Sequence, residues 1–257
     1  LLLAVIQVGA TYIPLDLQYP DDRLAFMLDD AKADLLVTLS TEENRFTVSN
    51  RLYVDDLPEL TQALALPTPD AEQVIYRLYT SGSTGNPKAA LVYRHSFELL
   101  LQSYQQQLQL TEHDKLLVIS ALGFDLTQKN LFVALTTGAT VVLHDSPVYD
   151  PSEIAGVIDE QNISIINCAP SAFYPLIETG HNDKLTSLRC VLFGGEPIAL
   201  QRLAPWVKQT DFNCQLVNMY GPTECTDIST SCLLNPIDIQ QLLDNGEAVP
   251  LGKPYPG

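Results

Sequence analysis

Hydroxyl side chains, two glycines and a lysine are gathered in one short string that follows an apolar segment. The string reads Tyr79-Thr80-Ser81-Gly82-Ser83-Thr84-Gly85-Asn86-Pro87-Lys88. Glycines let backbone N–H groups approach an anion closely, hydroxyl groups add donors, and a lysine adds positive charge. This chemistry predicts a cradle for a polyphosphate. It is not the Walker loop, because Asn86 and Pro87 separate Gly85 from Lys88. The alternative is a flexible Ser/Gly turn between two strands.

A second group of chemically useful side chains stands at the end of another apolar segment, in the string Asn218-Met219-Tyr220-Gly221-Pro222-Thr223-Glu224. The Tyr220 ring can stack on a base, and the Asn218 amide can hydrogen-bond an adenine edge. The Thr223 hydroxyl can meet a phosphate oxygen, and Glu224 can hold Mg²⁺. Open α/β sheets bind ligands beyond the carboxyl ends of their strands, which is where this string falls. Taken alone, it is also compatible with an ordinary turn.

The elements that must position these side chains are strands alternating with helices. Short, β-branched apolar runs predict strands at Leu35–Thr38, Val74–Tyr79, Leu116–Ser120, Thr140–Leu143, Ile163–Asn167, Cys190–Phe193 and Gln215–Met219. Amphipathic stretches predict helices at Pro20–Ala33, Ser96–Leu108, Thr127–Thr136, Pro151–Gln161, Ala172–Glu178 and Leu200–Lys208. The alternation predicts an α/β fold with a wound, mostly parallel sheet covered by helices on both faces. The polar stretch Thr41–Gln73 is predicted to be a connection on the surface between two wound segments rather than a domain boundary.

Composition excludes several classes of protein. Fourteen Lys and Arg against 31 Asp and Glu give a net charge of −17, which argues against a nucleic-acid binder. An apolar content of 46% with 18% charged residues is that of a globular domain. The opening run Leu1–Ile6 is too short to span a bilayer and lacks a basic flank, so we expect a cytoplasmic protein with no membrane partner. The run and the final Pro256-Gly257 indicate a fragment of a longer chain.

The cysteines and histidines show no metal-ligand or disulfide spacing. The five cysteines form no C-x-x-C pair, so we expect buried, reduced thiols. They are Cys168, Cys190, Cys214, Cys225 and Cys232. The four histidines are scattered, which excludes a zinc cluster built on them.

Together the two strings resemble those of the adenylate-forming, AMP-binding enzyme superfamily, and more narrowly the amino-acid adenylation domains of nonribosomal peptide synthetases. Further stretches are similar to motifs of this family and follow in family order. They are Val8-Gly9-Ala10-Thr11-Tyr12-Ile13-Pro14-Leu15-Asp16, Phe124-Asp125-Leu126-Thr127, Phe193-Gly194-Gly195-Glu196 and Pro250-Leu251-Gly252-Lys253-Pro254. The matches span residues 8 to 254, nearly the whole chain.

The resemblance implies a role for each matching residue. The loop over the ATP phosphates would comprise Thr80, Ser81, Gly82, Ser83, Thr84, Gly85 and Lys88. The adenine would be bordered by Gly194, Gly195 and Glu196 and contacted by Asn218 and Tyr220. Thr223 would touch the α-phosphate, and Glu224 would be the Mg²⁺ ligand. Lys88, Thr223 and Glu224 are thus the expected catalytic residues. One departure is Ala89, where the family usually has Gly.

For the amino-acid substrate, the resemblance implies that Asp125 pairs with the α-ammonium group. The alternative for Asp125 is an ordinary helix N-cap. The side-chain pocket would be lined by Leu126, Lys129, Asn167, Leu192, Gly194, Met219, Asp227 and Ile228. Two charges are unusual in a pocket for an apolar side chain. Lys129 and Asp227 therefore either pair with each other or meet a polar substrate group; otherwise Lys129 snorkels outward and Asp227 faces water.

The function that the resemblance implies is ATP-dependent activation of an α-amino acid as an aminoacyl-adenylate. The acyl group would then pass to the phosphopantetheine thiol of a peptidyl carrier protein, beside condensation domains of the same assembly line. Residues 1–257 would be the central part of the AMP-binding N-terminal domain. The family's ribose-binding Asp and its small C-terminal domain, with a catalytic Lys, would lie beyond the chain, so the isolated fragment is expected to be inactive. Alternatives are another adenylate-forming acyl-CoA or aryl-acid ligase, against which Asp125 argues, and a non-catalytic nucleotide-binding fragment.

Overall fold

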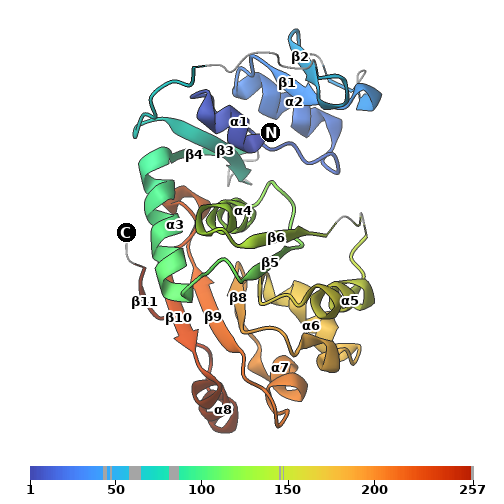
Figure 1. The fold of residues 1–257 in the computed structure, drawn as a ribbon, viewed down its shortest axis with the longest axis vertical. Helices are drawn as coiled ribbons and strands as arrows, with labels where there is room; N and C mark the ends of the chain where they lie inside the picture. The colour runs from blue at the N-terminus through green and yellow to red at the C-terminus, as the bar shows by residue number, and fades with distance from the viewer. Residues whose placement is uncertain are drawn as a thin grey trace. The chain divides into compact units, whose positions relative to one another are not determined.

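The computed structural model describes residues 1–42, 45–46, 48–57, 65–80, 87–144, 146 and 148–255. The chain forms two compact units, Leu1–Tyr93 and Arg94–Gly257. Each unit has its own strands and helices and is described by itself (Figure 1).

Within its described residues, the first unit contains two small two-stranded sheets and two α-helices. Its elements are α1 (Leu2–Gln7), α2 (Asp21–Asp30), β1 (Leu36–Thr38), β2 (Arg51–Tyr53), β3 (Val74–Thr80) and β4 (Lys88–Tyr93). Strands β1 and β2 are parallel, whereas β3 and β4 form an antiparallel pair in which Thr80 lies opposite Lys88. Leu24 of α2 and Leu36 of β1 are buried together with Phe46. This unit therefore presents the predicted phosphate loop as the connection of a β-hairpin.

The second unit is built on a seven-stranded sheet with the order β11-β10-β9-β8-β7-β5-β6. The strands are β5 (Lys115–Val118), β6 (Thr140–Leu143), β7 (Ile165–Cys168), β8 (Cys190–Gly194), β9 (Gln215–Tyr220), β10 (Thr230–Leu234) and β11 (Lys253–Pro254). The five strands from β6 to β9 in this order are parallel, and β10 and β11 continue the sheet in antiparallel fashion. The predicted α/β fold with a mostly parallel sheet is confirmed.

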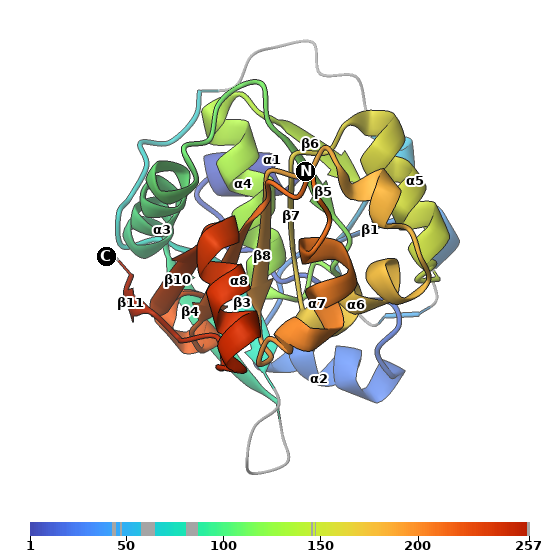
Figure 2. The same cartoon turned by 90° about the horizontal axis from the view of Figure 1, so that it is seen from below.

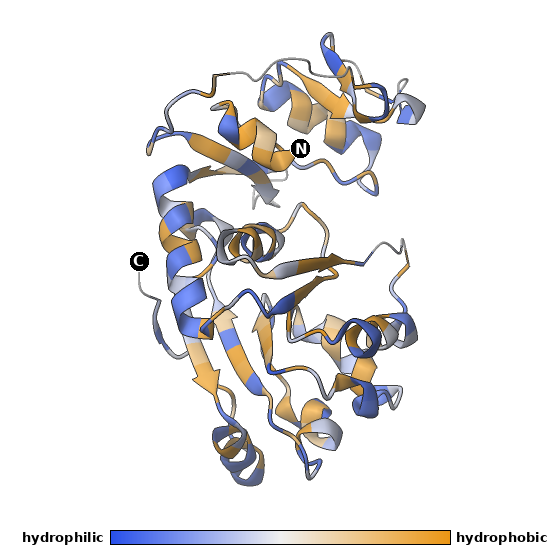
Figure 3. Ribbon diagram, in the orientation of Figure 1, coloured by the Kyte–Doolittle hydropathy of each residue, from blue (hydrophilic) through white to orange (hydrophobic). Residues whose placement is uncertain are grey.

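Helices cover both faces of this sheet (Figures 1 and 2). The helices are α3 (Arg94–Leu108), α4 (Asp125–Thr137), α5 (Pro151–Gln161), α6 (Pro170–Glu178), α7 (Leu200–Val207) and α8 (Pro236–Asn245). Helices α3 and α4 contact each other, and α4 contacts β5, β6 and β7. On the opposite face, α5, α6, α7 and α8 contact one another in chain order. The strands between these layers are mainly hydrophobic (Figure 3).

The larger core lies between the sheet and helices α5 to α8. Its centre is aromatic: the ring centroid of Phe173 lies 5.4 Å from that of Phe193 and 5.2 Å from that of Trp206. Phe173 and Phe193 are fully buried. Burial of side chains of this size contributes about 1.5–3 kcal/mol each, so this face supplies much of the stability of the second unit.

The observed elements agree with most of those predicted, and the differences have local causes. The bounds of β6 and α5 match the prediction, and α5 begins with the expected cap, since Asp150 accepts from the backbone N–H of Ser152. Helices α1 and α8 and strands β2, β4, β10 and β11 were not predicted. The predicted surface connection Thr41–Gln73 contains β2. Because β2 pairs with β1, part of this stretch belongs to a sheet. The division between the two units falls after Tyr93, outside that stretch.

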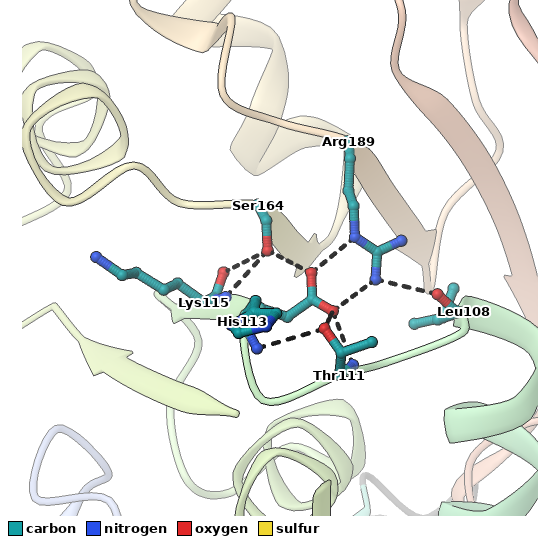
Figure 4. A network of polar contacts seen from close by, with 7 residues as sticks. Leu108, Thr111, His113, Lys115, Ser164 and Arg189 are labelled. Carbon is teal, nitrogen blue, oxygen red and sulfur yellow. Dashed lines mark hydrogen bonds and ion pairs between the residues drawn. The ribbon is translucent and has the colours of Figure 1, made fainter. Parts of the chain in front are cut away.

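A charged network joins β5, β7 and β8 at their amino ends (Figure 4). The Asp114 carboxylate accepts from Arg189 Nε at 2.7 Å, from Arg189 Nη2 at 2.9 Å and from Ser164 Oγ at 2.8 Å. It also accepts from the backbone N–H of Thr111 at 3.0 Å. Burial raises the pKa of Asp114, but the hydrogen bonds from Arg189, Thr111 and Ser164 outweigh it and lower the pKa to about 2. This network closes the end of the sheet opposite to its carboxyl edge.

The described part of the chain holds no helix that combines the length and the apolar character needed to cross a membrane. All five cysteines are free. The expectation of buried thiols is correct for Cys168, Cys190 and Cys214, whose pKa values are raised by burial. It is wrong for Cys225, which is exposed in the turn that follows β9, and only partly correct for Cys232.

Candidate functional site

The carboxyl ends of the parallel strands β5, β7, β8 and β9 lie along one edge of the sheet, because parallel strands share a direction. Most predicted site residues of the second unit fall at this edge. Asn167 is the penultimate residue of β7, Gly194 ends β8, and Tyr220 ends β9. Asp125 opens α4, the helix that follows β5. The topology thus places strings far apart in sequence where open α/β sheets bind ligands.

The predicted phosphate loop connects β3 and β4 of the first unit. Thr80 ends β3 and Lys88, which is exposed, begins β4. The predicted donors Ser81, Gly82, Ser83, Thr84 and Gly85 lie outside the described residues. Ala89, the departure from the family pattern, pairs with Tyr79 in the hairpin without any register shift.

The Gly-Gly-Glu turn after β8 has a backbone conformation that explains the glycine at position 195. Gly195 has φ +83°, a conformation that residues with a side chain adopt only under strain. Glu196 turns toward the start of α6, where its carboxylate accepts from the backbone N–H of Ser171 at 3.1 Å and from Ser171 Oγ at 2.8 Å. A carboxylate at a helix N-terminus is favourable there. In this structure Glu196 therefore fixes the turn against α6.

The two predicted adenine contacts differ in availability. Asn218 is buried in β9, and its Nδ2 donates to the carbonyl oxygen of Pro250 at 2.9 Å. This bond ties β9 to the stretch before β11, so the amide already has a structural partner. Tyr220 is 55% exposed at the end of β9, and its ring is available for stacking.

Asp125 is the first residue of α4, and the N-cap is Phe124. The alternative that Asp125 is the N-cap is therefore wrong. Its Oδ1 accepts from the backbone N–H of Leu126 at 2.8 Å, and its Oδ2 accepts from Thr223 Oγ1 at 2.6 Å. The expected α-ammonium partner and the expected α-phosphate contact are thus hydrogen-bonded to each other.

The loop from Gly221 to Ser229 is a compact connection between β9 and β10. It contains a short 3₁₀ turn, Thr223–Cys225, and closes with a hydrogen bond from Ser229 N to Tyr220 O at 2.8 Å. A Cβ on Gly221 would lie 2.2 Å from Asp227 O, so only glycine fits there. The sequence did not single out this glycine for a packing role, although Gly before Pro at a strand end was a visible signal.

Glu224 is the only predicted metal ligand, and it is exposed on this loop. Among the described residues, no three His, Cys, Asp or Glu side chains gather in a way that could hold a metal ion. Mg²⁺ is usually held by one or two protein carboxylates together with substrate phosphates and water. A single accessible carboxylate one residue after Thr223 fits that manner of binding.

Lys129 and Asp227 form an ion pair, which confirms the first of the three alternatives. The Lys129 side chain is fully buried and that of Asp227 is 10% exposed, so neither faces solvent as the snorkelling alternative required. Burial raises the pKa of Asp227 to about 6, against the lowering effect of Lys129; the Asp125 carboxylate also raises it. The other predicted pocket residues are buried or half-buried: Leu126, Asn167, Leu192, Gly194, Met219 and Ile228.

A buried polar network beside this pair was not predicted. Asn167 Nδ2 donates to Asn130 Oδ1 at 3.1 Å, and the Tyr104 hydroxyl donates to the same oxygen at 3.2 Å. Burial holds the pKa of Tyr104 well above its usual range. Tyr104 and Asn130 belong to predicted helices, but nothing in their spacing distinguishes them from other helix residues. Only the crossing of α3 and α4 brings them to Asn167.

A cavity of about 560 Å³ lies in the first unit between α2 and the segment around Phe46–Asn50. None of the predicted site residues that the structure describes lines it.

The chain is similar to known proteins over most of its length. The family model described as "AMP-binding enzyme" matches residues 1–257. The dimodular nonribosomal peptide synthase of Bacillus subtilis (strain 168) is 34% identical over 249 residues, which are 91% of this chain and 10% of that protein. Vanchrobactin synthetase VabF of Vibrio anguillarum is 35% identical over 232 residues, 86% of this chain and 8% of that protein.

Among solved structures, the nonribosomal peptide synthetase FmoA3 aligns with a TM-score of 0.84 at 25% identity. The alignment covers 99% of this chain and 27% of that one. The chain thus spans about a tenth of the length of the curated relatives and about a quarter of this solved structure. The match of the family model over the whole chain shows that the chain belongs to the AMP-binding enzyme family.

Proposed function

We propose that this chain is the central part of the large N-terminal domain of an amino-acid adenylation domain, and that the enzyme containing it forms an aminoacyl-adenylate from an α-amino acid and ATP. The observation that carries the proposal is the hydrogen bond between Asp125 and Thr223. The bond brings the residue expected to bind the amino group next to the residue expected to bind the α-phosphate, and an enzyme that condenses these two substrates needs both groups close together.

In this proposal the substrate carboxylate attacks the α-phosphorus of ATP, and pyrophosphate leaves. Side chains form no covalent bond in such a transfer, so their work is positioning and charge neutralisation. Lys88 and the loop that begins at Thr80 hold the phosphates that leave. Tyr220 stacks on the base, and Thr223 donates to an α-phosphate oxygen. Bound Mg²⁺ on Glu224 would supply further positive charge to the phosphates. Support for the nucleotide comes from FmoA3, which has also been solved in an AMPPNP-bound form.

Asp125 supplies the negative charge for the substrate's α-ammonium. It is half-buried at the amino end of α4, where the partial positive charge of the helix terminus favours a carboxylate. A buried carboxylate and a bound ammonium offset each other's desolvation. The side chain of the amino acid then points toward Leu126, Lys129 and the other predicted pocket residues.

The proposed partners follow from the relatives, which are nonribosomal peptide synthases. We expect the aminoacyl group to pass to the phosphopantetheine thiol of a peptidyl carrier protein, with condensation domains in the same assembly line. A cytoplasmic location is part of the same proposal.

The test is amino-acid-dependent exchange of pyrophosphate into ATP by the full-length synthetase that contains this chain. Glu224→Gln keeps the size of the side chain and removes its charge, so it should lower the exchange rate by about 100-fold. Glu160→Gln, an exposed change on α5, serves as the matched control. Exchange driven equally well by carboxylic acids without an amino group would point to an acyl or aryl-acid ligase. Mg·ATP binding without any exchange would point to a non-catalytic nucleotide-binding domain.

A further inference from the structure

The ion pair of Lys129 and Asp227 neutralises the charges of both members inside the proposed substrate pocket. The Lys129 ammonium lies 5.1 Å from the centroid of the Tyr104 ring and 3.9 Å from Met219 Sδ, and Asp227 is its carboxylate partner. The methylene stem of Lys129 is buried with its head, since the side chain has no exposed surface. Neither charged group is therefore available to form an ion pair with a substrate.

The backbone around Asp227 is constrained, which limits where its carboxylate can lie. Thr226 has φ +59° and Asp227 has φ +85°, two consecutive residues in the left-handed region. Such a conformation persists only where the surroundings enforce it. The surroundings here are the backbone of Gly221, which leaves no room for even a Cβ against Asp227 O, and the hydrogen bond from Ser229 N to Tyr220 O. The carboxylate is thus held in place beside Lys129.

The rest of the proposed lining carries no charge. Its apolar members are Leu126, Leu192, Gly194, Met219 and Ile228. Its polar member is Asn167, which is hydrogen-bonded in one network with Asn130 and Tyr104. In this network Asn130 Nδ2 and Asn167 Oδ1 are buried and have no hydrogen-bond partner within the described residues. Each Asn is 1% exposed. A buried donor and a buried acceptor without partners are costly, and a ligand that pairs with both recovers that cost.

From this arrangement we infer that the pocket selects an amino acid whose side chain is uncharged and carries hydrogen-bonding groups, a carboxamide or a hydroxyl. The inference rests on the proposed function and specifies its substrate class. A charged side chain would have to break the Lys129–Asp227 pair in a desolvated site, which leaves one of the three charges without a partner. A hydrocarbon side chain would leave the Asn130 donor and the Asn167 acceptor unpaired.

The experiment measures kcat/KM for pyrophosphate exchange by the full-length synthetase, with a panel of L-amino acids each varied in concentration. Glutamine, asparagine, serine and threonine represent the inferred class, glutamate and aspartate the acidic class, lysine and ornithine the basic class, and leucine and valine the hydrocarbons. We expect the best substrate in the uncharged polar class, with kcat/KM about 100-fold or more above every charged one. A charged amino acid or a hydrocarbon as the best substrate would overturn the inference.

Two variants test the ion pair directly. Lys129→Met leaves Asp227 without its cation and should raise the kcat/KM ratio of lysine to glutamine by about tenfold or more. Asp227→Asn leaves Lys129 without its anion and should raise the ratio of glutamate to glutamine to a similar extent. A ratio measured on one preparation is independent of the fraction of active enzyme, so partial misfolding does not disturb it. The matched controls are Lys208→Met and Asp159→Asn, both exposed, which should leave these ratios unchanged.

The outcomes separate the two proposals. Exchange that no amino acid stimulates contradicts the proposed function itself. Exchange that is amino-acid-dependent but prefers a charged side chain leaves the proposed function intact and overturns the inference. Variant ratios that stay at the wild-type value show that the pair does not face the substrate, which also overturns it.

Discussion

Thr223 Oγ1 donates a hydrogen bond to Asp125 Oδ2 at 2.6 Å, across 98 positions of the chain. A hydroxyl group has one proton to donate, so Thr223 cannot hold Asp125 and donate to a phosphate oxygen at the same time. An ammonium group that reaches Asp125 competes for the same carboxylate oxygen. Occupation of the amino-acid site would thereby release Thr223 for its proposed contact with the nucleotide.

Replacement of Asp125 should separate the charge of this residue from its hydrogen bond. Asp125→Asn keeps an acceptor for Thr223, whereas Asp125→Ala removes both. An ammonium left without its carboxylate costs about 3–5 kcal/mol, or more than a hundredfold in kcat/KM. Both variants should therefore lose that factor with the amino acid and far less with its des-amino analogue, as measured by pyrophosphate exchange. Retention of amino-acid activity in Asp125→Asn would show that only the bond to Thr223 matters.

Lys88 is exposed at the start of β4, where the proposed phosphate loop ends. Loss of one charge-assisted contact to a phosphate should weaken Mg·ATP binding by about 10- to 100-fold in Lys88→Ala. The shift in melting temperature during an Mg·ATP titration measures this affinity. Lys208→Ala, an exposed change on the second unit, is the control. Equal affinities in the two variants would remove Lys88 from the site.

Asp114 makes the stability of the second unit dependent on pH. Its pKa is lowered to about 2 in the folded protein, against about 3.9 for an unfolded Asp. A lowered pKa contributes stability that is complete above the unfolded value and is lost as the pH falls from about 4 to about 2. Asp114→Asn should cost about 3 kcal/mol at pH 7, because it leaves Arg189 without its charged partner.

Urea unfolding at several pH values tests this expectation. The difference between wild type and Asp114→Asn should shrink steadily below pH about 4. Asp159→Asn on the exposed side of α5 should show no such trend. A pH-independent difference would mean that the variant acts through packing alone.

Gly252 and Gly180 have the same φ of +84° but different surroundings. A Cβ on Gly252 would lie 1.9 Å from Ser231 O of β10, whereas a Cβ on Gly180 meets nothing within 4 Å. Gly180→Ala should cost about 1–2 kcal/mol for the left-handed conformation alone. Gly252→Ala should cost more, because the overlap displaces β11 or β10. Thermal unfolding, with hydrogen exchange of the β10 amides, compares the two; equal losses would contradict the close approach.

Local patterns in the sequence were enough to predict the elements that dominate this fold. Proline at the first position of α5 after Asp150, and β-branched runs such as Thr140–Leu143, carry their conformation in the residues themselves. The strings around Lys88 and Glu224 likewise indicated phosphate and metal chemistry, and the family assignment followed from their order. Helix α8, which was not predicted, carries a readable local signal in the capping box formed by Asn235 and Asp238.

The tertiary structure decided which side chains meet. Sequence left three alternatives for Lys129 and Asp227, and only the return of the loop after β9 onto α4 makes them an ion pair. The same loop brings Thr223 to Asp125, which the sequence offered as a helix cap and which instead accepts a hydrogen bond from Thr223. The network of Tyr104, Asn130 and Asn167 depends on how α3 and α4 lie across β7. Such contacts join residues dozens of positions apart, and their energy depends on burial, which no local pattern of residue types encodes.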